Sequence, residues 1–350
     1  MALEIHPVQR ARDFNLFWQL EKNLYSPAER SKLPPLEITK KKLNPRFNQF
    51  LQHISWQCYL AFLNNKVIGR IIASHDHYLA DQSIGFFGLW EVDNNFEAAQ
   101  GLLKAAENWL QKQGKKQIVG PVTLSTADNL GLLVEGFEQQ NPFFLSYNHP
   151  YYQDLLEKAG YRKLHDLYAY HWSSSQQISP RLHKISLRLQ KSKQVIIRPI
   201  RFNKLREEAE KFLSIYNSAM VENWGYTPLT LGEVSHILHD FRKRFKPEFC
   251  LFAEVKEAPA GLCLAVPDQN NGTKRAVRLA ILAVSPEFNH LGLSALLVTE
   301  MISYVKKKGF QQAELSFIQE GNQVVNKLIQ EDVGSSIIKR YRLYTKELST

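Results

Sequence analysis

The chain has 350 residues, of which 44% are hydrophobic and 11% aromatic. This length and composition predict about two globular domains with packed cores, and they exclude an intrinsically disordered chain. Lysine and arginine outnumber aspartate and glutamate by 44 − 34 = 10. Such a surplus favours a polyanionic partner, namely a nucleotide cofactor, nucleic acid or an anionic membrane surface. A soluble basic protein without any such partner explains it equally well.

The cysteine pattern and the hydropathy bound the class of protein further. Cys58, Cys250 and Cys263 are scattered in apolar runs, which favours neither a disulfide framework nor a zinc site. The N-terminus lacks the pattern of a secretory signal, and no run approaches the roughly 20 apolar residues that span a membrane. We therefore expect a cytoplasmic protein without a metal centre. Peripheral membrane contact remains open.

The first half predicts strands and helices in a definite order. The helix at 11–24 is predicted from Phe14, Phe17 and Trp18 on one side, and a hairpin is predicted from the turn Asn64-Asn65. In chain order we expect a strand at 3–8, a helix at 11–24, a hairpin of 57–63 with 66–74, a strand at 84–90, a helix at 96–113 and a strand at 117–122.

The second half repeats this order. The polar stretch 173–180 lacks periodicity and predicts a linker, so the expected domains are 1–175 and 176–350. The elements expected beyond it are a strand at 194–200, a helix at 204–220, a β pair of 249–255 with 261–266, a strand at 277–284, a helix at 293–307 and a strand at 312–318. A helix at 322–330 and a strand at 337–345 close the chain. The repeated order indicates an internal duplication.

The segment 281–297 carries the strongest functional signal. An apolar strand there leads through Pro286 and Gly292 into an amphipathic helix. The first N–H groups of a helix lack helical partners and carry partial positive charge, so this connection is suited to an anionic group. An ordinary strand–turn–helix connection has the same local pattern.

Many short segments resemble a bacterial family of two-domain GNAT-like proteins related to long-chain N-acyltransferases. In the first half they are VIGRIIA (67–73), GPVTLS (120–125), GLLVEGF (131–137) and YNHPYY (147–152). In the second half they are YN (216–217), NWG (223–225), PDQN (267–270), EGN (320–322) and YRLY (341–344). The resemblance implies an α/β (α+β) fold of tandem GNAT-like domains, each a mixed sheet flanked by helices. It also implies an acyl-CoA or acyl-carrier thioester as donor, and it says little about the acceptor.

The resemblance assigns the donor site to the second half. The family's pyrophosphate loop corresponds to Asn289, Gly292 and Ser294, of which Gly292 alone meets the usual pattern. A strand that splays after Leu282 would offer main-chain groups to the pantetheine arm and the reacting carbonyl. The residues expected at the cofactor are Leu282, Ala283, Val284, Asn289, His290, Leu291, Gly292, Leu293 and Ser294.

Other positions depart from the family pattern. The segment 91–96 lacks the glycine element, so the first half is expected to be a degenerate copy without cofactor. Ile329 stands where the family places a tyrosine that protonates the departing thiolate.

The catalytic groups have to come from elsewhere in the second half. Asp268 and Glu320 are the candidate bases, because strand-end carboxylates often form sites in α/β sheets. Tyr344 is the candidate acid on the last strand, with Tyr341 as the alternative on the other face. Strand-end acids are also common turn formers, and buried tyrosines commonly serve packing.

The leading hypothesis is an acyl-thioester-dependent N-acyltransferase whose acceptor is an amine-bearing metabolite, amino acid or lipid. Two alternatives remain open. One is a non-catalytic acyl-CoA-binding or scaffold protein, which Asn289 and Ile329 favour. The other is a tRNA-dependent aminoacyl transferase, which the basic surplus would suit. No long heptad run is present, as such enzymes tend to carry, so nucleic acid is the less favoured partner.

Overall fold

The computed structural model describes residues 2–268 and 275–348. It divides into two compact units, Met1–Leu167 with Lys339–Thr350 (the first unit) and Tyr168–Ile338 (the second unit). The chain crosses between them inside strand β7 (Arg162–Ser173) and again inside strand β13 (Ser336–Glu347). The sequence predicted a single division at 175/176. In the structure the boundary falls within strands, and most of the last strand belongs to the first unit.

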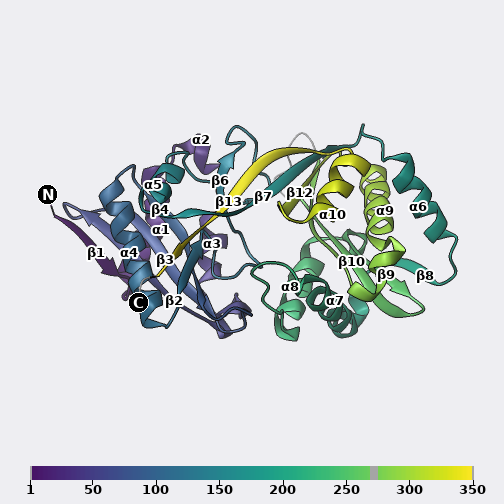
Figure 1. The fold of residues 1–350 in the computed structure, drawn as a ribbon, viewed down its shortest axis with the longest axis horizontal. Coiled ribbons are helices and arrows are strands. Elements are labelled where there is room, and N and C mark those ends of the chain that lie inside the picture. The colour runs from purple at the N-terminus through teal and green to yellow at the C-terminus, as the bar shows by residue number, and fades with distance from the viewer. Residues whose placement is uncertain (1, 269–274, 349–350) are drawn as a thin grey trace. The chain divides into compact units, whose positions relative to one another are not determined.

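The first unit is a mixed sheet with helices against it (Figure 1). Its strands follow the order β1-β2-β3-β4-β5-β13, with β6 also paired to β13. The strands are β1 (Leu3–Pro7), β2 (Ile54–Leu63), β3 (Lys66–Asp76), β4 (Ile84–Val92), β5 (Gln117–Gly120) and β6 (Leu132–Glu135). The helices are α1 (Ala11–Leu24), α2 (Pro27–Arg30), α3 (Leu36–Lys42), α4 (Phe96–Lys112) and α5 (Tyr152–Lys158).

Helix α4 shows why this sheet is covered where it is. Ala99, Leu102, Ala106 and Leu110 follow helical spacing, and all four are completely buried. They pack in one core cluster with residues of β3 and β4. Each buried leucine contributes about 1.5–3 kcal/mol relative to an exposed one, so the apolar stripe fixes the helix on the sheet.

The second unit repeats the arrangement with a longer helical set. Its strands follow the order β7-β12-β11-β10-β9-β8. The strands not yet given are β8 (Val195–Pro199), β9 (Cys250–Val255), β10 (Ala258–Pro267), β11 (Ala276–Val284) and β12 (Gln312–Gln319). The helices are α6 (Pro180–Gln190), α7 (Leu205–Met220), α8 (Leu231–Arg244), α9 (Leu293–Lys307) and α10 (Gln323–Lys327). The 3-10 segment η4 (Pro286–Leu291) precedes α9, and a π-helical turn (Leu328–Asp332) follows α10.

The helices of the second unit form two pairs. Helices α7 and α8 pack on each other, as do α6 and α9 (Figure 1). Both α7 and α9 contact β10 and β11. The two central strands are therefore held by helices from both pairs.

The predicted α/β class and the tandem arrangement are confirmed. The helices at 11–24 and 293–307 have the predicted bounds. Sequence reasoning missed α8, although Thr230 and Glu233 form a capping box at its start. It also missed α6, which begins where the predicted linker ends and is capped by Ser179. Among the helices of the described residues, none combines the length and apolar character that a membrane span needs.

A buried ionic cluster stabilises one edge of the second unit. Arg198 on β8 donates to Glu208 at 2.7 and 2.9 Å and to Glu254 at 2.7 Å. Lys211 donates to the same Glu254 oxygen at 2.7 Å. Burial opposes ionisation of Glu254, but these hydrogen bonds outweigh it and lower the pKa of that carboxyl.

Candidate functional site

The second unit contains a split between two parallel strands. Strands β11 and β12 pair from Ala276↔Gln312 to Leu279↔Leu315. Beyond that point β11 continues to Val284 and β12 continues to Gln319, with no further paired positions between them. Alternate main-chain groups of β11 beyond Leu279 therefore point into the split without a ladder partner on β12.

The split begins earlier than the sequence predicted. We expected the splay after Leu282, and the last paired residue is Leu279. The register of β11 against β10 shifts at the same place, from Ala265↔Leu279 to Leu264↔Ile281, which leaves Ala280 as an extra residue. A bulge bends its strand and re-aims the neighbouring groups, which accounts for the early divergence.

The N-terminus of α9 follows the open end of β11. Gly292 precedes it with φ of +87°, a left-handed conformation that favours glycine. No side chain caps the helix, so the first-turn N–H groups at Leu293 and Ser294 are available to an external acceptor. Asn289 and His290 lie just before, exposed on η4.

A basic side chain that the sequence analysis did not single out stands beside this loop. Arg188 on α6 donates to the carbonyl oxygen of Leu291 at 3.4 Å. Ile185 on the same helix lies 3.0 Å from where a Cβ on Gly292 would be. Helix α6 therefore borders the candidate anion site and adds a guanidinium to it. Its sequence signal was the basic amphipathic pattern of 180–190.

A second wall of the split comes from α7 and the segment after it. Ser218 on α7 donates to the hydroxyl of Ser285, the residue that follows β11, at 3.2 Å. Asn217 holds the segment beyond α7 through two hydrogen bonds to Leu229, at 3.0 and 2.9 Å. Gln319 at the end of β12 donates to the carbonyl oxygen of Trp224 at 3.4 Å. These contacts tie the ends of both strands to α7 and its loop.

Glu320 lies at the end of the split, as predicted. It directly follows β12, and because β11 and β12 are parallel it stands at the same sheet edge as Val284. Asn326 donates to the main-chain oxygens of Gln319 and Glu320 at 2.9 and 3.3 Å. Tyr170 in turn donates to Asn326 at 2.7 Å. Burial raises the pKa of Tyr170 to about 12, so we assign it to holding this turn rather than to proton transfer.

The structure corrects the expectation for Asp268. Strand β10 is antiparallel to β11, and the N–H of Asp268 donates to the carbonyl oxygen of Ala276 at the start of β11. The split opens at the other end of β11, roughly 26 Å along the strand from Ala276 to Val284. A residue that follows an antiparallel strand therefore faces the wrong edge for this chemistry. Residues 269 and 270 of the segment PDQN lie outside the described residues.

The expectation for Tyr344 is also corrected. Tyr344 belongs to the first unit, where it pairs with Gly120 of β5. It is completely buried, and its hydroxyl donates to Glu157 at 3.1 Å. Tyr341 on the same strand is likewise buried in the first unit. Neither tyrosine lies in the unit that carries the β11–β12 split, because the last strand returns to the first unit.

A polar group at the base of the split was missed by the sequence analysis. Arg278 and Glu314 are register partners on β11 and β12. Arg278 donates to the hydroxyl and the carbonyl oxygen of Ser316 at 3.0 and 2.9 Å, and Ser316 donates to Glu314 at 3.0 Å. The available signal was a single charged residue within each of the two strands. The group closes the paired end of the two strands.

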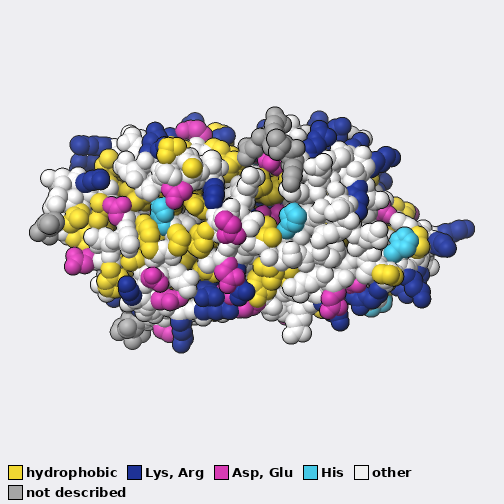
Figure 2. Space-filling view, turned by 90° about the horizontal axis from the view of Figure 1, so that it is seen from above, with side chains coloured by type: hydrophobic (Ala, Val, Ile, Leu, Met, Phe, Trp, Pro, Cys, Tyr) yellow, Lys and Arg dark blue, Asp and Glu magenta, His cyan; other side chains and the backbone are white. Residues whose placement is uncertain are grey.

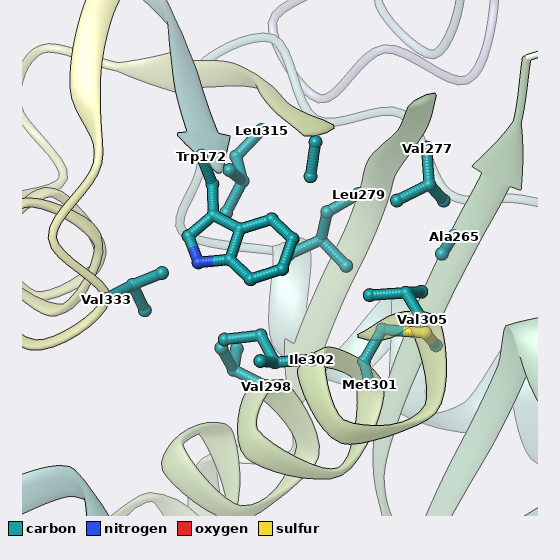
Figure 3. Close-up of a pocket in the computed structure, with 11 residues that line it drawn as sticks. Trp172, Ala265, Val277, Leu279, Val298, Met301, Ile302, Val305, Leu315 and Val333 are labelled. Atoms are coloured by element: carbon teal, nitrogen blue, oxygen red, sulfur yellow. The ribbon is translucent and has the colours of Figure 1, made fainter. Parts of the chain in front are cut away.

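A small apolar cavity of about 30 Å³ lies next to the same strands. Figure 3 shows Leu279 and Leu315, the last register pair, facing it together with the indole of Trp172. Met301 and three further residues of α9 form its other side (Figure 3). The cavity thus adjoins the apex of the split, and its lining is apolar.

Within the described residues, no group of three or more His, Cys, Asp and Glu side chains is placed to hold a metal ion. The groups at the split are main-chain amides of β11 and of the start of α9, the carboxylate of Glu320 and the guanidinium of Arg188. This set is suited to binding a phosphate-bearing thioester and to proton transfer.

Sequence comparisons agree with this geometry. Residues 209–334 match the family described as "Acetyltransferase (GNAT) family". The chain is 28% identical to "Protein YghO" of Escherichia coli (strain K12) over 368 aligned positions, which cover 96% of this chain and 93% of that one. It is 26% identical to "Bacterial ceramide synthase" of Caulobacter vibrioides (strain NA1000 / CB15N), with 87% of each chain covered.

Solved structures show the same fold over the whole length. A tandem GNAT protein from the clavulanic acid biosynthesis pathway superposes with a TM-score of 0.63 at 11% identity and covers 100% of this chain and 99% of its own. A GCN5-related N-acetyltransferase from Sphaerobacter thermophilus gives a TM-score of 0.56 at 13% identity, with 99% and 96% covered. These likenesses extend the fold assignment beyond the matched residues 209–334 to both units.

Proposed function

Because the chain belongs to the acyl-CoA N-acyltransferase (GNAT) superfamily, we propose that its second unit transfers an acyl group from a thioester, acyl-CoA or an acyl carrier, to an amine. One observation carries the proposal. Strands β11 and β12 separate beyond Leu279 and Leu315, and the uncapped start of α9 follows the open end of β11. An extended thioester arm fits the split, and its diphosphate fits the helix start.

In this transfer the amine nitrogen attacks the thioester carbonyl carbon. A C–N bond forms, the C–S bond breaks, and the electron pair leaves with the sulfur. Main-chain N–H groups of β11 beyond Leu279 would stabilise the oxygen that gains negative charge. Gly292, Leu293 and Ser294 would hold the diphosphate, with Arg188 adding positive charge.

Glu320 is the proposed general base. It stands at the open end of the split, where an incoming ammonium has to lose a proton before it can attack. The thiolate also needs a proton, and Ile329 is buried where the family places a tyrosine. We propose that water or the ammonium proton supplies this need, so a tyrosine acid is not required.

The acceptor is proposed to be an amine-bearing small molecule or lipid. A relative named "Bacterial ceramide synthase" supports an amide-forming reaction on a lipid amine. Figure 2 shows both basic (Lys, Arg) and acidic (Asp, Glu) side chains on the visible face.

The test uses the purified full-length chain with acetyl-, octanoyl- and palmitoyl-CoA. Thermal stability and free-thiol release are recorded with and without a panel of amines that includes a long-chain amino alcohol. Stabilisation by a longer acyl-CoA together with amine-dependent thiol release is the expected result. Absence of both, with every donor, contradicts the proposal.

A non-catalytic acyl-CoA-binding protein is the second candidate. The buried Ile329 in place of a tyrosine favours it. The same experiment separates the two functions, because binding without transfer gives stabilisation without thiol release.

A further inference from the structure

The first unit contains a polar cavity of about 100 Å³ at its own strand split. Strands β4 and β5 pair from Ile84↔Gln117 to Phe86↔Val119, and β4 then continues to Val92. Its register against β3 shifts by one residue beyond this point, where Leu89 has φ of +43°. Strand β5 ends at Gly120, the N–H of Val122 still donates to the carbonyl oxygen of Phe87 at 2.7 Å, and the cavity lies beside the bulged part of β4.

The cavity wall mixes charged, polar and apolar side chains. Helix α3 contributes Thr39 and Lys42, and β4 contributes Leu89, Trp90 and Glu91. The other lining residues are Glu21, Leu33, Pro34, Arg70, Pro121, Thr123, Asn129, Gly131, Leu132, Leu145, Ser146, Tyr147 and Asn148. By volume it accommodates about three water molecules or one small organic molecule.

One guanidinium, that of Arg70, lies near two carboxylates, those of Glu21 and Glu91. Arg70 is ion-paired with Glu21 and donates to the carbonyl oxygens of Phe17 and Leu89 at 2.8 and 3.3 Å. Its nearest approach to Glu91 Oε1 is 4.0 Å, which is too long for a hydrogen bond. The guanidinium is thus committed mainly to Glu21 and the main chain, and Glu91 is only partly compensated.

Glu91 presents one occupied and one open carboxylate oxygen. Its Oε2 accepts hydrogen bonds from the hydroxyls of Tyr25 and Tyr152 at 2.6 and 2.7 Å. Among the described residues, no hydrogen bond reaches its Oε1. The carboxyl group therefore has a free acceptor in a wall where Lys42, the other cation that lines the cavity besides Arg70, is already paired with Asp128 at 2.7 Å.

Two further polar atoms of lining residues are buried and unpaired. Thr39 is 3% exposed and Trp90 is 5% exposed. Neither Thr39 Oγ1 nor Trp90 Nε1 has a hydrogen-bond partner among the described residues. A buried polar atom left unpaired costs about 1–3 kcal/mol, so the fold maintains this wall at a cost in stability.

The split itself is closed to a thioester donor. The N–H of Val92 donates to the hydroxyl of Tyr152 at 2.9 Å, and its carbonyl oxygen accepts from Tyr151 at 2.8 Å. The start of α4 is capped by Asn95, whose Oδ1 accepts from the N–H of Ala98 at 2.9 Å. The groups that would hold a pantetheine arm and a diphosphate are therefore already engaged, and the occupant has to be small.

We propose that this cavity binds a small primary amine, such as ethanolamine, with the ammonium on Glu91 Oε1. The ammonium adds positive charge beside a carboxylate that Arg70 compensates only partly. Binding here involves no covalent step, and it does not depend on acyl transfer by the second unit.

Proton release from Glu91 on ligand binding provides a readout that a cavity filled only with water would not give. Burial raises the pKa of Glu91 to about 7. An ammonium beside it would favour the ionised carboxylate, so binding at pH 7 releases a proton to the buffer. The heat of binding therefore depends on the ionisation enthalpy of the buffer.

The experiment is calorimetry on the full-length protein at pH 7, in phosphate and in MOPS buffer, neither of which is a primary amine. The probes are ethanolamine and the uncharged ethylene glycol. We expect ethanolamine to bind with release of a fraction of a proton, and ethylene glycol to bind at least about tenfold more weakly. Equal binding of both probes overturns the proposal, and so does absence of ethanolamine binding up to about 10 mM together with absence of binding to phosphatidylethanolamine vesicles.

A variant tests the Glu91 contact. Glu91→Gln is expected to weaken ethanolamine binding at least about tenfold and to abolish proton release. Glu4→Gln, an exposed change in the same unit, is the control and should have no effect. Urea unfolding verifies that each variant is folded. If Glu91→Gln binds ethanolamine like the unaltered protein, the assignment of the cavity is wrong.

The same ammonium occurs free and as a lipid headgroup. Vesicles of phosphatidylcholine with and without phosphatidylethanolamine form the second arm of the test. Binding of free ethanolamine alone identifies a soluble ligand, and binding of vesicles only when they contain phosphatidylethanolamine identifies the headgroup. Failure in both arms overturns the proposal.

Discussion

The two units open their sheets at corresponding places and fill the openings differently. In the second unit β11 and β12 part beyond Leu279 and Leu315, and an uncapped helix start follows. In the first unit the ladder of β4 and β5 ends at Phe86 and Val119, the N–H of Val122 still donates to the carbonyl oxygen of Phe87 at 2.7 Å, and tyrosine hydroxyls and an asparagine cap occupy the main-chain groups further on. A shared backbone geometry therefore does not by itself make a donor site. A donor site also requires that the exposed main-chain amides have no partner within the protein.

The two units also differ in how they treat buried carboxylates. Glu254 in the second unit is paired with Arg198 and Lys211 at 2.7 Å each. Glu91 in the first unit keeps one oxygen open toward a cavity. The first is a satisfied structural cluster, and the second is a site that an outside cation can complete.

The largest expected effect separates chemistry at the two splits. Glu320→Gln should lower kcat for thiol release about a thousandfold and leave acyl-CoA affinity unchanged, because only the base is lost. Glu91→Gln, at the other split, should leave kcat within about twofold. Steady-state kinetics with one acyl-CoA measures both variants. An unaltered kcat for Glu320→Gln removes that residue from the mechanism.

The next effect concerns the helix start. Gly292→Glu should weaken acyl-CoA binding about a hundredfold, because its carboxylate would stand against the diphosphate. Gly114→Glu is the matched control, since Gly114 has φ of +74° with no atom within 4 Å of an added Cβ. Gly292→Ala separates backbone strain from charge. Calorimetry gives the affinities, and an equal loss in Gly292→Ala would show that strain alone is responsible.

A third prediction uses pH. The pKa of Glu91 is about 7 in the folded protein against 4.5 for an unperturbed glutamate, so the folded state binds the proton more tightly. Its stabilising contribution is complete below about pH 4.5 and is lost as pH rises to 7, by about 3 kcal/mol in all. Glu254, whose pKa is lowered, has the opposite sign and loses its contribution as pH falls.

Urea unfolding at several pH values between about 3 and 8 tests this contrast. The difference in unfolding free energy between the unaltered protein and Glu91→Gln should change by about 3 kcal/mol over that range. For Glu254→Gln the difference should change in the opposite direction at acid pH. A Glu91→Gln difference that is flat with pH would mean that this carboxyl titrates normally.

The smallest expected effect is a change in stability when the first residues of helices α4 and α9 are altered. Asn95→Ala should destabilise the protein by about 1 kcal/mol, because α4 loses its side-chain cap. Ser294→Ala should change stability by less than about 0.5 kcal/mol, because α9 has no such cap. Thermal unfolding compares the two. Equal losses would contradict the difference in capping between the units.

Local patterns predicted much of the fold. The helices at 11–24 and 293–307 were placed correctly because their apolar spacing and their boundaries are local properties. The strand at 277–284 and the glycine turn after it were found for the same reason. The split was placed three residues late, because a bulge at Ala280 depends on pairing with β10.

The candidate site was only partly predictable. Glu320 was placed at the correct edge because β12 follows a helix and runs parallel to β11. Asp268 was misplaced because antiparallel pairing of β10 puts its end at the opposite edge. The partners of Glu91 come from Tyr25 and Tyr152, more than 60 residues away on either side, and no local pattern announces such a cluster.

The sequence by itself determined the elements, their repeated order and the resemblance to tandem acyltransferases, because these depend on neighbouring residues and short motifs. The tertiary structure alone decided which strands part, which helix start stays uncapped and to which unit the last strand belongs. Strand pairing and capping join residues far apart in the chain. Which pairs and caps form depends on the relative stability of competing partners, and the local spacing of residues does not reveal that stability.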